Sequence, residues 1–87
     1  MSTIGAEMGQ LQQLKGTFDK EAQDVERLRA AISKQVGATW WKGPAADRFR
    51  NAWHGQFEPS LKSLHNALHE ASAEVQRRHH ALTQAGS

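Results

Sequence analysis

The feature that most constrains this chain is a pair of long apolar runs at helical spacing, separated by one short segment that contains glycine and proline. In the first run the larger apolar residues recur at intervals of three, four or seven, which is the repeat of one helix face. In the second run the interval is four up to Leu61 and follows a heptad after it. We therefore expect one helix over about residues 6–36, a turn over about 37–43, and a second helix over about 44–83.

The segment between the runs carries stop and start signals for helices. Gly37 is placed to end the first helix, because glycine adopts the left-handed conformation at little cost. Gly43 and Pro44 are typical of an N-cap and a first helical position. Inside the second run, Pro59 cannot donate a hydrogen bond to the carbonyl of Gly55. The apolar stripe continues through this point, so we expect a local kink or loosening rather than a helix end.

A short connection makes consecutive helices antiparallel neighbours, so the sequence predicts an all-α fold in which residues 1–87 form a single helical-hairpin domain. Two helices side by side bury only the strip between them, whereas the apolar stripes on both runs are wide. We therefore expect a second hairpin to cover the remaining surface and complete a four-helix bundle dimer. The residues expected to pack the hairpin and the dimer are Leu11, Leu14, Phe18, Val25, Leu28, Ile32, Phe49, Trp53, Phe57, Leu61, Leu64, Leu68 and Val75.

Three polar residues interrupt these stripes. In the first run, Leu14 and Leu28 share one heptad position, and Glu21 and Gln35 also fall at that position. In the second run, Arg78 stands at the corresponding position near the end of the helix. Arg78 is unusual for a simple core and is expected to face the partner or solvent.

The turn carries the most specific motif, Trp41-Lys42-Gly43, followed by small residues and then by Phe49 and Trp53. At the centre of a cysteine-free, two-helix chain of 87 residues, this motif resembles the WXG (Trp-x-Gly) family of small helical-hairpin proteins exported by type VII (ESX) secretion systems. The resemblance implies a dimeric protein-binding module in which Trp41 and Gly43 shape a turn that the export machinery recognises. The alternative for Trp41 is a purely structural role that covers the open end of the helix pair.

The resemblance also suggests which partner to expect. Many family members carry a C-terminal Tyr-x-x-x-Asp/Glu secretion signal, and this chain has no tyrosine. It therefore looks like the subunit without that signal, and a heterodimer with another WXG-family protein is favoured over a homodimer. Contact with the type VII secretion ATPase is then expected through the tail of the partner.

Targeting and charge exclude other classes. The first residues show neither a basic region nor an apolar run of signal-peptide length, and no segment is long enough to span a bilayer. We therefore expect a protein made in the cytoplasm and secreted without a cleaved signal peptide, with no stable membrane insertion. The formal net charge of +2 is too small to indicate nucleic-acid binding. The alternative is a cytosolic homodimeric adaptor or a nucleic-acid-associated hairpin that uses Arg77 and Arg78.

No catalytic constellation is present. The chain has no cysteine and no glycine-rich phosphate loop, and no carboxylate pair is placed in a predicted cleft. His65 and His69 are spaced to lie on one helix face, but no glutamate follows His65 and no third ligand is evident. We therefore expect no enzyme activity, no cofactor and no metal site.

Overall fold

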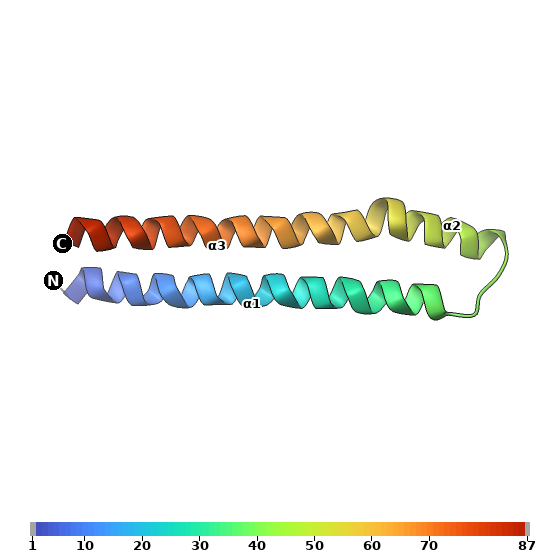
Figure 1. The fold of residues 1–87 in the computed structure, drawn as a ribbon, viewed down its shortest axis with the longest axis horizontal. Coiled ribbons are helices and arrows are strands. Elements are labelled where there is room, and N and C mark those ends of the chain that lie inside the picture. Colours follow the sequence, from blue (N-terminus) through green and yellow to red (C-terminus); the bar gives the residue numbers. More distant parts are fainter. Residues whose placement is uncertain (1, 87) are drawn as a thin grey trace.

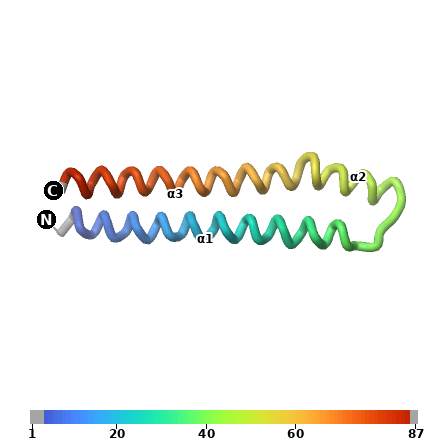
Figure 2. Tube along the Cα trace, in the orientation of Figure 1, coloured from blue at the N-terminus to red at the C-terminus, as the bar shows by residue number. Residues whose placement is uncertain are grey.

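The computed structural model describes residues 2–86 of the chain, and the side chains of residues 4–85. One arm is the helix α1, Ser2–Ala38. The other arm consists of α2, Pro44–Ala52, a π-helical turn, Trp53–Phe57, and α3, Glu58–Gly86. The arms lie antiparallel, with both chain ends at the same end of a rod of 65 × 16 × 13 Å (Figure 1). The tube in Figure 2 shows that the arms stay side by side along their whole length. The predicted all-α helical hairpin is confirmed.

The first helix continues past the point where the sequence places its end. Gly37 lies within α1, and Gly43 is the glycine with a positive φ, 112°, among the described residues. The expectation that Gly37 ends the helix in a left-handed conformation is therefore wrong. Thr39 explains the continuation, because its backbone N–H donates to the carbonyl of Gln35 at 2.9 Å and its hydroxyl donates to the same oxygen at 2.6 Å. These bonds cap the helix end without a left-handed residue.

The second arm widens just before Pro59. The backbone N–H of Glu58 donates to the carbonyl oxygen of Trp53, five residues earlier, which is the bonding of a π-helix. Because Pro59 has no N–H to continue the ordinary pattern, the extra residue in this turn accommodates the proline without ending the arm. The local loosening expected at Pro59 is thus a single π-helical turn. Apolar residues spaced by four drift around the surface of a regular α-helix. The extra residue in the π-helical turn corrects this drift, so that Trp53 and Leu61 both turn toward α1.

The core between the arms is thin. Among the described side chains, the buried apolar residues are Ala22, Ala46 and Trp53, and the buried polar residue is Ser72. Small side chains at Ala22 and Ser72 let the two long helices approach closely in the middle of the rod. No helix within the described part of the chain combines the length and the apolar character needed to cross a bilayer.

Candidate functional site

The turn is fixed by the conformation of Gly43. This residue caps α2 with φ 112° and ψ 176°, a backbone region that side-chain-bearing residues rarely adopt. A Cβ atom built at Gly43 would meet no atom within 4 Å, so the requirement for glycine is conformational rather than one of space. Pro44 occupies the first helical position, as the sequence predicts, and Asp47 lies in the first turn of α2, where its negative charge suits the helix dipole.

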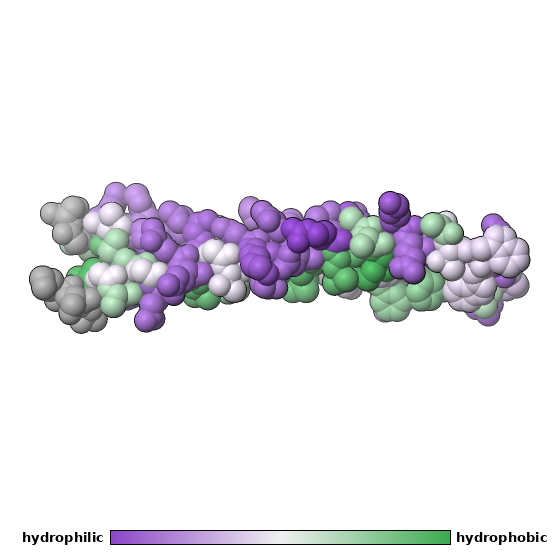
Figure 3. All heavy atoms as spheres, turned by 90° about the horizontal axis from the view of Figure 1, so that it is seen from below, coloured by the Kyte–Doolittle hydropathy of each residue, from purple (hydrophilic) through white to green (hydrophobic). Residues whose placement is uncertain are grey.

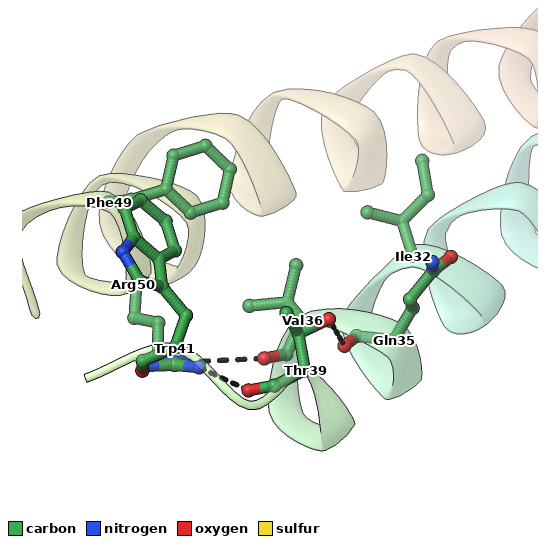
Figure 4. A pocket seen from close by; sticks show the side chains of 7 residues that line it. All are labelled: Ile32, Gln35, Val36, Thr39, Trp41, Phe49 and Arg50. Atoms are coloured by element: carbon green, nitrogen blue, oxygen red, sulfur yellow. Dashed lines mark hydrogen bonds between the residues drawn. The ribbon is translucent and has the colours of Figure 1, made fainter. Parts of the chain in front are cut away.

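Arg50 joins the end of α1 to the turn. Its guanidinium donates hydrogen bonds to three backbone oxygens, those of Thr39 at 2.8 Å, Trp41 at 2.8 Å and Val36 at 3.3 Å (Figure 4). A helix ends with carbonyl groups that lack partners, and a cation is favoured there by the helix dipole. One side chain from α2 therefore satisfies the end of α1 and fixes the path of the connection. Residue spacing in the sequence does not predict this role of Arg50, because only the folded turn brings the side chain opposite these carbonyls.

Trp41 and Phe49 form an aromatic pair beside this cap. Their ring centroids lie 5.9 Å apart with the rings tilted by 45°, and both side chains remain partly exposed. Together with Ile32, Val36 and Arg50 they border a mostly apolar groove of about 280 Å³ (Figure 4). Trp41 thus covers the end of the helix pair and still presents an aromatic face to solvent.

The neighbouring tryptophan behaves differently. Trp40 is 85% exposed and does not line this groove. The two adjacent indoles are therefore distinct: Trp41 belongs to a defined surface with Phe49, whereas Trp40 projects into solvent. This contrast makes Trp40 a matched control for experiments on Trp41.

A polar network crosses the rod behind the turn. The indole N–H of Trp53 donates to the hydroxyl of Ser33 at 3.0 Å, and that hydroxyl donates to Oε2 of Glu58 at 2.6 Å. Arg29 donates to the same carboxylate oxygen at 2.6 Å and also binds Glu26 with two hydrogen bonds. The network ties α1 to both sides of the π-helical turn.

The charge state of this network is set by its hydrogen bonds. Those that Glu58 makes with Ser33 and with His54, reinforced by Arg29, lower the pKa of the carboxyl to about 2. The hydrogen bonds to Glu26 and Glu58 raise the pKa of Arg29 above its ordinary value. The side chains of Glu58 and Arg29 are only 14% and 18% exposed, so this ion pair is more shielded than those on the outside of the rod.

The predicted packing residues divide into three groups by exposure. Trp53 is buried, and the half-buried group turns toward the opposite arm: Leu11, Phe18, Val25, Ile32, Leu61, Leu68 and Val75. The third group is 43–49% exposed: Leu14, Leu28, Phe49, Phe57 and Leu64. A hairpin alone therefore leaves five of the thirteen predicted packing residues exposed.

Most of the exposed group shares one face of the rod. Leu14 and Leu28 occupy the same heptad position in α1, and Leu64 occupies the equivalent position in α3, with Phe57 one heptad before it. In an antiparallel pair, equivalent heptad positions lie on the same side. We call this side the open apolar face. Figure 3, which views the rod from the α1 side, shows apolar surface gathered toward the turn and hydrophilic surface over the middle.

The opposite face of the hairpin is polar. His65 and His69 stack there with ring centroids 6.2 Å apart, beside Lys15, Asp19 and Gln23. Among the described residues, no three His, Cys, Asp or Glu side chains come together in a way that could hold a metal ion.

These features define a class of protein: a small antiparallel hairpin with a tryptophan–glycine turn and one uncovered apolar face. Residues 3–87 match the WXG100 family, described as proteins of 100 residues with WXG, and the chain belongs to this family. Its members are small helical proteins of type VII secretion that associate with other WXG proteins. No curated protein and no solved structure matches the chain.

Proposed function

We propose that this chain is one half of a dimeric protein-binding module of a type VII secretion system. One observation carries the proposal: five of the thirteen residues that the sequence marks for packing remain 43–49% exposed in the hairpin, and most of them share one face. Monomeric proteins rarely leave so extended an apolar stripe uncovered. A second hairpin laid on this face completes a four-helix bundle, the usual way for such stripes to be buried.

The partner that fits best is another WXG-family protein, and a heterodimer is favoured over a homodimer. None of the 87 residues is a tyrosine, which favours the partner as the source of the tyrosine-containing signal and of the contact with the secretion ATPase. In this scheme the pair is made in the cytoplasm and exported without cleavage of a signal peptide.

The second part of the proposal concerns the turn. Gly43 fixes its backbone, Arg50 closes it onto α1, and Trp41 with Phe49 presents an aromatic surface at the end of the rod. Aromatic side chains on a fixed backbone are effective recognition elements, because little conformational freedom is lost on binding. We infer that the export machinery recognises this end of the bundle through Trp41.

Pairing is tested by placing charge on the open apolar face. We expect the double variant Leu28→Glu and Leu64→Glu to abolish co-purification with a co-expressed WXG-family partner, because two carboxylates would be buried without partners. Gln23→Glu is the matched control, since Gln23 borders the polar face. Circular dichroism checks that the helices persist. Co-purification that survives the double substitution would show that pairing uses another surface.

The role of the turn is tested by export. We expect Trp41→Ala to reduce secretion into the medium at least about tenfold while the cytoplasmic pool of folded dimer persists. Trp40→Ala is the control, because Trp40 is outside the aromatic pair. If Trp41→Ala instead unfolds the hairpin, the tryptophan has a structural role only.

The alternative function, a nucleic-acid-associated hairpin, has less support. Arg77 hydrogen-bonds to Glu74 in the same helix, and Arg78 lies 3.7 Å from Glu7 across the rod. Both arginines thus have carboxylate partners, which weakens the basic patch that phosphate binding requires.

A further inference from the structure

The open apolar face carries an acidic residue, Glu21, near its centre, whereas Glu7, which falls at the same heptad position near the chain ends, has an ion pair with Arg78. Leu14, Glu21 and Leu28 follow one another at intervals of seven residues, so the three side chains leave α1 on the same side. The side chain of Glu21 is 53% exposed. Since α1 extends from Ser2 to Ala38, Glu21 lies one residue from its midpoint.

The hairpin itself offers this carboxylate little compensation. The ion pair of Glu21 is with Lys20 at 3.5 Å, but the Lys20 ammonium lies closer to Asp24, at 2.9 Å, and its side chain is 70% exposed. Across the rod, the hydrogen bond between Asp19 and Ser72 marks the level of α3 that lies beside Glu21. The residue of the open face at that level is Ala71, which carries no charge.

Self-pairing would place like charges together. A two-fold symmetric dimer through the open face has the two turns either at the same end or at opposite ends of the bundle. When the two rods overlap along their full length, the middle of the rod meets the middle of its copy in both arrangements. Two Glu21 carboxylates would therefore share one level of the interface, and like charges juxtaposed in an interface oppose association.

We propose that Glu21 is a specificity position: it disfavours a second copy of this chain and selects a different helical hairpin that carries a lysine or arginine at the middle of its own apolar face. A basic side chain at the middle of the partner pairs with the Glu21 carboxylate. A second copy of this chain would instead place another carboxylate beside it. The inference rests on the pairing through the open apolar face proposed above, and adds the chemistry of the partner at one residue.

A charge-reversal experiment tests the proposal with the full chain alone. The Glu21→Lys variant stands in for a partner with a basic midpoint, and an equimolar mixture of differently tagged wild-type and Glu21→Lys chains is compared with each chain alone by sedimentation equilibrium. We expect the mixed dimer to have a Kd at least about tenfold lower than either homodimer. We also expect Glu21→Leu to self-associate more tightly than wild type, since it removes the repulsion and extends the apolar stripe.

The matched control is Glu70→Lys, which makes the same charge change at an exposed position outside the open face. Mixtures with this variant are expected to match wild type alone. If the wild-type chain self-associates in a way that Leu28→Glu abolishes, and the Glu21→Lys mixture is no tighter, the specificity role is wrong while the pairing surface stands. If no form associates and Leu28→Glu has no effect on capture of a co-expressed WXG-family partner, the pairing surface itself is wrong.

Discussion

The two halves of this hairpin are joined by different kinds of interaction. In the half near the turn, Arg50 binds three backbone oxygens of the α1 end and the connection, while Trp53 and Glu58 reach Ser33 in α1. In the half near the chain ends, the polar contacts between the arms include the Ser72–Asp19 hydrogen bond and the looser Arg78–Glu7 ion pair.

This difference indicates which half of the hairpin is structured in the absence of a partner. Hydrogen bonds to several fixed acceptors define one geometry, so the turn half is organised within a single chain. The terminal half relies on apolar side chains such as Leu11 and Val75, which a lone hairpin leaves partly exposed. We therefore expect substitutions near the turn to destabilise the isolated chain more than equivalent substitutions near its ends.

The largest effect is expected from Trp53→Ala. Trp53 is the large side chain among the three buried apolar residues of the described chain, at 6% exposure, and its indole N–H is bonded to Ser33. Its removal leaves a cavity and takes away the N–H donor to the Ser33 hydroxyl, which keeps its bond to Glu58, with an expected loss of about 3–5 kcal/mol in the free energy of unfolding. Urea unfolding followed by circular dichroism measures it. Trp40→Ala, at an 85% exposed position, is expected to change stability by less than about 0.5 kcal/mol.

Arg50→Met is expected to cost less, about 2 kcal/mol, because the side chain keeps its apolar stem but loses three charge-assisted hydrogen bonds. Hydrogen exchange is expected to quicken in the last turn of α1 and in residues 39–43, with little change in α3. Arg50→Lys tests the geometry, since one ammonium cannot reproduce a fork that spans three carbonyls. Full rescue by lysine would show that positive charge alone closes the turn.

The sequence predicts the parts of this fold that depend on spacing. The spacing of apolar residues predicts both arms, and Gly43-Pro44 predicts the start of α2. Both predictions succeed because they depend on residues that are close together in the chain. The roles of Arg50 and Glu58 depend on how far each arm is rotated about its own axis. The π-helical turn before Pro59 sets that rotation for α3, and a heptad count cannot supply it. The export role of Trp41 and Gly43 stays a prediction.

The two halves are also expected to contribute differently to the pH dependence of stability. Glu58 has a pKa of about 2 in the folded chain against an ordinary value of 4.5, so the unfolded chain binds more protons between these values. Its contribution is complete above about pH 5 and is lost as the pH falls toward 2. The pKa of Asp19, in the terminal half, is also lowered, first by its hydrogen bond with Lys15 and then by that with Ser72.

We therefore expect acid to destabilise the chain, and Glu58→Gln to remove more of this dependence than Asp19→Asn. Thermal unfolding at pH 7, 4.5 and 2.5 measures both variants against wild type. If Asp19→Asn instead flattens the dependence of thermal stability on pH and Glu58→Gln leaves it steep, the terminal half contributes more of the acid sensitivity than the turn half.

The smallest effect is expected from Ser72→Ala, in the terminal half. Ser72 is only 3% exposed, but its hydroxyl makes one hydrogen bond to Asp19, and that carboxylate keeps its 2.8 Å ion pair with Lys15. The loss of one hydrogen bond is worth about 1 kcal/mol, and the higher helix propensity of alanine offsets part of it. Ser63→Ala, at an exposed position, controls for that propensity. A loss for Ser72→Ala as large as that for Arg50→Met would mean that the middle of the rod is fixed as firmly as the turn. The terminal half would then need no partner to complete it.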